Sequence, residues 1–111
     1  MLNPDFTDDR LQPQGQLYFC PFNAMLEGVL KYYPNLHQHL DITHINFQRP
    51  RNIIVEMVGE ENQDMPLLII KNVVANPVIG IKQCNDHKFI VGAENILKYL
   101  AINYHVPLPH P

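Results

Sequence analysis

The residue best suited to take part in a reaction is Cys20, within the run Phe19-Cys20-Pro21-Phe22-Asn23. The apolar stretch 17–19 ends there and an amphipathic pattern begins at Asn23. Pro21 suits the first helical position, because its fixed φ is helical and its missing N–H would be unpaired there anyway. Unpaired N–H groups and the positive dipole end of a helix favour a thiolate in the first turn. The pattern predicts a nucleophilic cysteine at a helix start; the alternative is a packed, unreactive thiol.

The other cysteine, Cys84, precedes His87 at the Cys-x-x-His spacing of half a zinc site, and His37 and His39 could add ligands. Zinc sites need ligands that converge from two well-formed halves. We interpret these residues as surface histidines and a loop cysteine, and we expect no metal. A resolving role for Cys84 towards Cys20 would require the long loop around Cys84 to fold back over Cys20.

Composition bounds the class of protein. The 111 residues are 46% hydrophobic and 17% charged, which is typical of a single globular domain spanning residues 1–111. The net charge of −3 argues against nucleic acid, and we interpret Arg49-Pro50-Arg51 as a solvated helix start rather than an anion site. No apolar run approaches the roughly 20 residues of a membrane span. With two cysteines and no secretory signal at Met1-Leu2, we expect a cytoplasmic protein.

Periodicity predicts the elements that position Cys20. Residues 1–16 are rich in turn signals, and residues 105–111 form a Pro-rich tail. The apolar and β-branched patterns predict a helix over 23–33, a strand over 40–47 buried on both faces, a helix over 49–57 ended by Gly59, a central strand over 67–70, a strand over 88–91 and a helix over 94–104.

The connection over 72–86 is unusually apolar for a loop, with Val73, Val74, Val78, Ile79 and Ile81. We expect it to pack on its own domain or to form a small hairpin. The alternative is an exposed patch for a partner or for a second copy of the chain, as in a homodimer.

With a strand ahead of the first helix, the elements make a βαβ unit followed by a ββα unit. This order predicts an α/β fold with a four-stranded mixed sheet and helices on both faces.

That order, with Cys20-Pro21 opening the first helix and Pro66 before the strand over 67–70, resembles the thioredoxin-like superfamily. The nearest patterns are glutaredoxins and the N-terminal domain of glutathione transferases, whose last strand and helix look like Phe89-Ile90-Val91-Gly92 and 94–101. Shorter motifs resemble a small thioredoxin-like family catalogued as a domain of unknown function; they are Tyr18-Phe19-Cys20-Pro21, Glu27-Gly28, Arg49-Pro50-Arg51, Gly59-Glu60-Glu61-Asn62-Gln63 and Pro107-Leu108-Pro109-His110-Pro111.

The resemblance implies a thiol-exchange site around Cys20 and restricts the reaction that the site could perform. Pro66 would form a cis peptide bond beside Cys20 and let the backbone of Met65 meet an extended thiol substrate, with Pro21, Phe22 and Asn23 completing the substrate-binding residues. Asn23 occupies the position of the usual second cysteine, which excludes a dithiol cycle. Relatives begin with a longer apolar strand than Met1-Leu2, so we expect a chain that starts late and has a shortened first strand.

Gly92-Ala93 stand where glutathione transferases carry the acidic residue and serine that hold the γ-glutamyl group of glutathione. This substitution, with no helical second domain, argues against a glutathione-conjugating enzyme. The leading hypothesis is monothiol thiol–disulfide exchange at Cys20. It would act on a thiol- or disulfide-bearing peptide or a small thiol, without a bound cofactor and with glutathione as co-substrate. The competing hypothesis is a non-enzymatic binding module in which Cys20 is vestigial.

Overall fold

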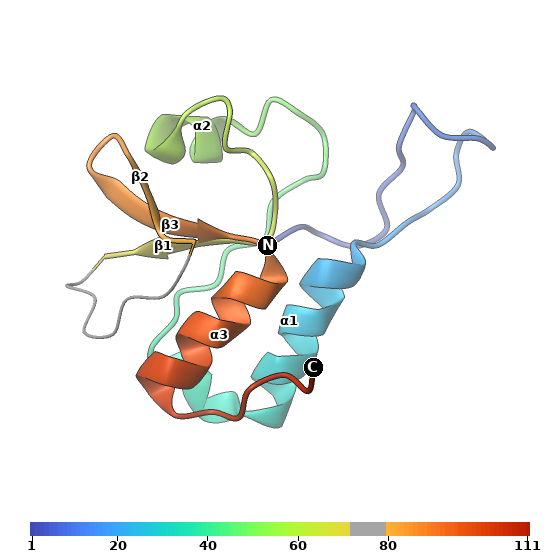
Figure 1. Ribbon diagram of the computed structural model, residues 1–111. Coiled ribbons are helices and arrows are strands. Elements are labelled where there is room, and N and C mark those ends of the chain that lie inside the picture. The colour runs from blue at the N-terminus through green and yellow to red at the C-terminus, as the bar shows by residue number, and fades with distance from the viewer. Residues whose placement is uncertain (72–79) are drawn as a thin grey trace.

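Three antiparallel strands and three α-helices make a mixed α/β fold in the computed structural model, which describes residues 1–71 and 80–111 (Figure 1). The elements in chain order are α1 (Pro21–Tyr32), the 3-10 helix η1 (Pro34–Gln38), α2 (Asn52–Val58), β1 (Leu67–Ile70), β2 (Lys82–Cys84), β3 (His87–Val91) and α3 (Ala93–Tyr104). Within the described ranges, no helix has both the length and the apolar content needed to cross a membrane.

The strands are ordered β1-β3-β2, so β3 lies in the centre of the sheet. Phe89 on β3 pairs with Ile69 on one side and with Lys82 on the other. The prediction of a central strand over 67–70 was therefore wrong in its position, because β1 is an edge strand of this sheet. Strand β2 was hidden within the predicted connection 72–86, since its residues are polar or only half-buried and carry no apolar pattern.

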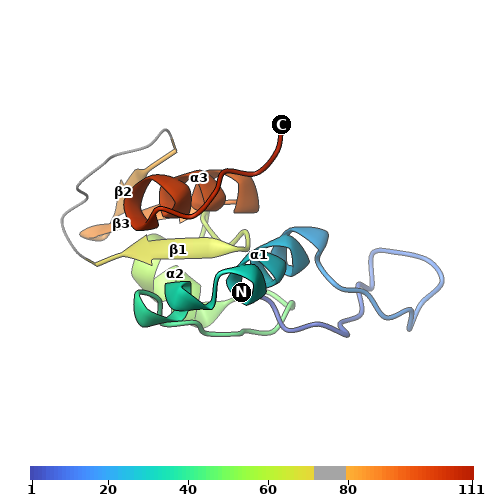
Figure 2. The same cartoon turned by 90° about the horizontal axis from the view of Figure 1, so that it is seen from below.

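Helices cover both faces of the sheet, as predicted: α2 lies on one face, and α1 and α3 lie on the other (Figures 1 and 2). Adjacent residues of β3 point in opposite directions, so Ile90 packs with α1 and α3, whereas Phe89 packs with α2. Both side chains are 0–1% exposed. Packing on two faces explains the apolar runs 67–70 in β1 and 89–91 in β3.

The expected four-stranded mixed sheet is not present in the described part of the chain. The predicted strand over 40–47 makes one parallel bridge, in which Ile45 pairs with Leu2 through hydrogen bonds to the backbones of Met1 and Asn3, both of 2.8 Å. The pairing stops there because Asp5, whose N–H would be the next donor towards this strand, turns the chain at a φ of 59°. The stretch 17–19 likewise pairs at a single point, between Tyr18 and Phe6.

The predicted helices are present with shifted ends. α1 begins at Pro21, in the first helical position as expected. α2 begins at Asn52, after Pro50 and Arg51, and ends before Gly59, whose φ of 91° suits glycine and interrupts the helix. α3 follows Gly92, which has a φ of 93°. These turns bring the starts of α1 and α3 and the entry to β1 to one end of the fold.

Candidate functional site

A groove of about 1440 Å³ lies at that end of the molecule. Five predicted site residues line it: Cys20, Pro21, Phe22, Met65 and Pro66. They come from chain segments more than 40 positions apart in the sequence, so the fold brings them together. Asn23, the sixth, does not line the groove.

Cys20 is the N-cap residue of α1, with extended backbone angles of φ −83° and ψ 117°. Its carbonyl accepts the first intrahelical hydrogen bond from Ala24 at 3.0 Å, whereas its side chain makes no capping bond. The thiol is partly exposed. A sulfur at this position is close to the unpaired N–H groups of the first helical turn, and that setting favours a thiolate.

Asn23 has a structural position beneath the groove. Its side chain is 4% exposed, and its Oδ1 accepts a hydrogen bond from the backbone N–H of Leu2 at 2.9 Å. The Nδ2 atom of Asn23 has no acceptor among the described residues. Asn23 therefore fastens the N-terminal segment to the first turn of α1, and its predicted place among the substrate-binding residues has no support from this geometry.

We expect Asn23→Ala to lower the free energy of unfolding by about 1 kcal/mol. The variant leaves the buried Leu2 N–H without its acceptor, which is unfavourable, but it also removes the unpartnered Nδ2 group, which offsets part of that loss. Urea denaturation of the variant and the parent chain measures the difference. A loss well above this value would show that Nδ2 has a partner in solution.

The segment opposite Cys20 is fixed by the backbone of Pro66. The Met65–Pro66 peptide bond is cis, as the resemblance implied. Pro66 is fully buried, and its carbonyl accepts a hydrogen bond from Gly92 N–H at 2.9 Å. This bond joins the entry to β1 with the start of α3. Met65 is partly buried and lines the groove next to Pro66.

Arg51 is a groove residue that the sequence pattern did not reveal. It is 6% exposed, so the interpretation of Arg49-Pro50-Arg51 as a solvated helix start was wrong for Arg51. Arg49 is the exposed member of the pair, and it forms an ion pair with Asp64 at 2.7 Å. Arg49 and Arg51 are the same residue type two positions apart, so the sequence gives no sign of which side chain is buried and which is exposed.

The guanidinium of Arg51 is held by backbone carbonyls. Nε and one terminal nitrogen donate to Phe47 O at 3.0 and 2.6 Å, and the other terminal nitrogen donates to Gln63 O at 2.6 Å. The guanidinium also lies 5.5 Å from the centre of the Phe47 ring. Burial lowers the pKa of Arg51, and the charge of Arg49 acts in the same direction, whereas Asp64 and Cys20 act to raise it.

The rim of the groove is apolar and exposed. Large side chains that line it and are 47–63% exposed are Leu11, Phe19, Phe22, Met25 and Leu108. Contiguous apolar surface of this kind is uncommon on a free protein and marks ligand or partner sites. The Pro-rich tail takes part, since 108–111 line the same groove.

The start of α3 supplies the polar groups on the facing wall. Gly92 and Ala93 line the groove but have no polar side chains. The next residues, Glu94 and Asn95, also line it, and Glu94 pairs with Lys98 at 3.0 Å. The resemblance to glutathione transferases pointed to Gly92 and Ala93 alone, so Glu94 and Asn95 were not expected at the groove.

The remaining candidate residues lie elsewhere. Cys84 packs beside the cluster of Ile54, Val58 and Phe89 that joins α2 to the sheet, away from the groove. In residues 1–71 and 80–111, no three His, Cys, Asp or Glu side chains converge in a way that could hold a metal ion. Of the apolar connection, Ile81 packs against the core of α1 and α3. Val73, Val74, Val78 and Ile79 lie outside the described residues.

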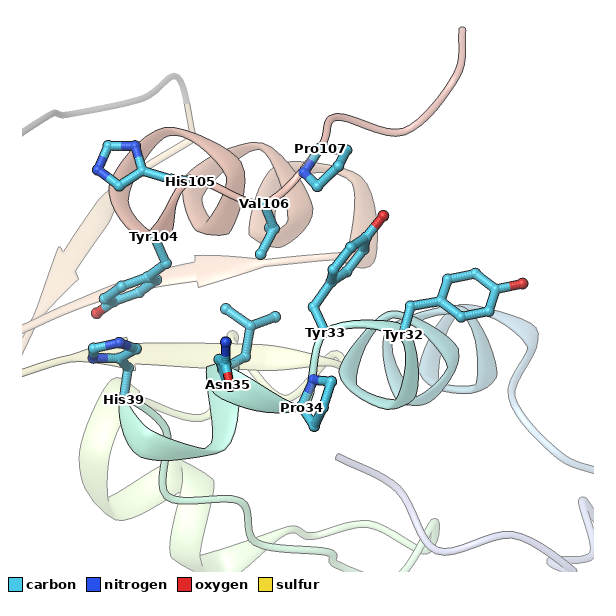
Figure 3. Close-up of a pocket in the computed structure, with 10 residues that line it drawn as sticks. Tyr32, Tyr33, Pro34, Asn35, His39, Tyr104, His105, Val106 and Pro107 are labelled. Carbon is cyan, nitrogen blue, oxygen red and sulfur yellow. The ribbon is translucent and has the colours of Figure 1, made fainter.

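A second, smaller cavity of about 330 Å³ lies between the C-terminal ends of α1 and α3 (Figure 3). The rings of His39 and Tyr104 stack in its wall with their centroids 4.5 Å apart. Tyr104 in turn meets the buried Tyr99 edge to face at 6.3 Å. This aromatic group joins the end of α3 to the segment after η1.

Tyr99 makes this cluster sensitive to alkaline pH. Burial, together with the charge and hydrogen bonding of Tyr104, raises the pKa of Tyr99 above its ordinary value of 10.0. The folded state therefore holds this proton more tightly than the unfolded state. The contribution of Tyr99 to the free energy of unfolding is fully present below pH 10 and is lost as pH rises through the folded pKa. We expect the unfolding free energy of the parent chain to fall above pH 10 and that of Tyr99→Phe to fall less. Equal slopes would contradict this assignment.

Fold and site together define a mixed α/β domain with a partly exposed cysteine at a helix start, in an apolar groove beside a buried arginine. The chain matches, over residues 1–108, the family model described as "Protein of unknown function (DUF3088)". It belongs to this family. Neither a curated protein nor a solved structure matches the chain.

Proposed function

We propose that the chain is a thioredoxin-like domain that performs monothiol thiol–disulfide exchange through Cys20. The observation that carries this proposal is the placement of a partly exposed N-cap thiol, Cys20, in one groove with Met65 and Pro66. The antiparallel pair of β1 and β3 followed by α3, and the parallel bridge of Leu2 with Ile45 on either side of α1, support the superfamily assignment. The bridge corresponds to the shortened first half of the expected βαβ unit.

In the proposed reaction the Cys20 thiolate attacks one sulfur of a disulfide. A bond forms between Cys20 Sγ and that sulfur, the original S–S bond breaks, and the departing thiolate takes a proton from solvent. A second thiolate, from glutathione, then attacks the substrate sulfur of the mixed disulfide and releases Cys20 as a thiolate. Because Asn23 carries no sulfur and Cys84 does not line the groove, the resolving thiol in this cycle comes from outside the chain. A glutathione-rich, reducing compartment such as the cytoplasm suits this cycle.

The direct test is formation of the mixed disulfide. The reduced protein is incubated with glutathione disulfide, and intact-mass and peptide mapping locate the adduct. We expect one glutathione on Cys20, which reduced glutathione removes, and little on Cys84. Alkylation at neutral pH should modify Cys20 faster than Cys84, as expected of an activated cysteine. Absence of the adduct together with a thiol that is unreactive at neutral pH would remove the enzymatic proposal.

The exposed apolar rim favours a second candidate, a non-enzymatic binding module. In this function the groove holds an apolar peptide segment against Phe22 and Met25, and the thiol of Cys20 is not needed. Unchanged peptide affinity in Cys20→Ser, with loss in Met25→Ser, distinguishes binding from exchange. Tyr32→Ser is the matched control, because Tyr32 is 78% exposed on the same helix but does not line this groove.

A further inference from the structure

An N-terminal arm, residues 7–17, projects from the body of the molecule (Figures 1 and 2). From Asp9 onwards its residues are all exposed. In the described part of the chain, one hydrogen bond joins the arm to the body, from Gln48 Nε2 to Thr7 O at 3.5 Å, and its other bonds close turns within it. The arm therefore packs very little against its own domain.

The base of the arm is fixed in direction. Phe6 and Tyr18 pair across it through two backbone hydrogen bonds of 3.0 and 2.8 Å. The ring of Phe6 also stacks on that of Phe47, with the ring centroids 4.2 Å apart. The anchored base holds two apolar side chains of the arm, Leu11 and Leu17, in solvent at 47% and 57% exposure.

The chain as a whole exposes more surface than a free domain of its mass. A monomeric protein of 12.9 kDa exposes about 6300 Å², whereas this chain exposes 7654 Å². The excess of about 1300 Å² exceeds the roughly 800 Å² that each partner buries in a stable protein–protein interface. The radius of gyration, 14.7 Å, is likewise larger than the value of about 13 Å expected for this length. The area left open is enough for a stable dimer.

The groove offers an apolar surface to such an arm. Phe22 and Met25 form the part of its rim that belongs to α1, and they are 59% and 50% exposed. They lie three positions apart, so both project from one side of the helix, whereas Leu26 and Leu30 are buried on another. A protruding apolar arm and a recessed apolar groove on one chain are self-complementary, as a two-fold symmetric dimer requires.

The charges of the arm and the groove are complementary as well. Of the Asp, Glu, Lys and Arg side chains that line the groove, all except Arg51 belong to an ion pair between described residues; the pairs are Asp8 with Arg10, Arg49 with Asp64, and Glu94 with Lys98. On the arm, Asp9 is the carboxylate outside these pairs. An unpaired cation in the groove and an unpaired carboxylate on the arm favour the arm of a second copy.

We propose that a second copy of the chain covers the groove: in a two-fold symmetric dimer, the arm of each copy lies against Phe22 and Met25 of the other. The inference goes beyond the proposed function and does not depend on the reactivity of Cys20. Because Cys20 lies in the same groove, the arm of the second copy would border the thiol. An apolar peptide that binds Phe22 and Met25 would compete with this arm.

Sedimentation equilibrium of the parent chain over tens to hundreds of micromolar tests the proposal, with a reductant present so that no disulfide links two chains. We expect a reversible dimer. Leu17→Ser on the arm and Met25→Ser on the rim should each raise the dimer dissociation constant about tenfold. Ile53→Ser is the matched control, because Ile53 is also 50% exposed but lies on α2 outside the groove, and it should leave the constant unchanged.

Mixing the two variants tests the exchange of arms directly. Leu17 does not line the groove, so Leu17→Ser keeps an intact groove, and Met25→Ser keeps an intact arm. A heterodimer of the two variants retains one of the two arm–groove contacts, so the mixture should associate more tightly than either variant alone. Asp9→Lys should also weaken the dimer, because it brings a second positive charge to the groove that holds Arg51.

A parent chain that stays monomeric at hundreds of micromolar would overturn the proposal, and binding of an apolar peptide to that monomer would assign the groove to another protein. A dimer that Leu17→Ser and Met25→Ser leave unchanged would overturn it too. The exchange function is judged separately, by the glutathione adduct on Cys20. A monomer that forms the adduct contradicts only the dimer, and a dimer that forms no adduct contradicts only the exchange.

Discussion

Cys20→Ser is expected to lose all catalysed exchange, leaving only the rate of glutathione with the disulfide in buffer. A serine hydroxyl does not ionise near neutral pH and cannot form a mixed disulfide, so no covalent intermediate remains. The measurement is glutathione-dependent reduction of a small mixed disulfide, followed by a coupled assay. Replacing sulfur by oxygen at a partly exposed N-cap leaves the packing of α1 intact. The free energy of unfolding of Cys20→Ser should therefore remain within about 0.5 kcal/mol of that of the parent chain.

Cys84→Ser is the matched control for this experiment. Cys84 is equally half-buried but lies on β2 beside α2, outside the groove. It should retain full exchange activity. If Cys84→Ser and Cys20→Ser lost activity to the same degree, the two cysteines would act as a pair and the monothiol cycle would be wrong.

Phe89→Ala is expected to have the largest effect on stability, a loss of about 3–5 kcal/mol in the free energy of unfolding. Phe89 is 1% exposed at the centre of the sheet, and with Ile54 and Val58 it forms the core beneath α2. This core is small, so the deletion leaves a void that few neighbours can fill. The loss is a large fraction of the roughly 5–15 kcal/mol that stabilises a typical domain.

Urea unfolding of Phe89→Ala measures the effect, with Ile102→Ala as the control. Ile102 is 44% exposed on α3, and its truncation should change stability by less than about 0.5 kcal/mol. A destabilisation below 1 kcal/mol would show that the face of β3 under α2 repacks.

The parts of the fold that could be predicted from the sequence are those with a strong local pattern. Leu26 and Leu30 on α1, and Ile96, Leu97 and Leu100 on α3, repeat at helical spacing and are buried as expected. The prediction of a strand over 40–47 was wrong because β-branched residues favour an extended backbone but do not supply a neighbouring strand to pair with. Its one bridge is to Leu2, and the positive φ of Asp5 turns the chain away before a second bridge can form.

For the site, residue types identified the thiol but not its electrostatic setting. Pro21 marked the helix start and so placed Cys20, and Pro66 marked the opposite wall. The burial of Arg51 depends on the carbonyls of Phe47 and Gln63, which are main-chain groups that every residue carries. The convergence of these carbonyls on Arg51 depends on the path of the backbone and not on residue types. The burial of Arg51 could therefore be recognised only from the folded structure.

The tail that follows α3 bears on how this protein can be handled. Residues 108–111 line the groove, and Leu108 is 63% exposed beside it. Alternating prolines stiffen the segment, so whatever is attached after Pro111 starts at the mouth of the groove. A purification tag or fluorescent fusion at that end would restrict access to the groove and to Cys20, whereas a label on the exposed face of α2, at Ile53, would leave the groove clear.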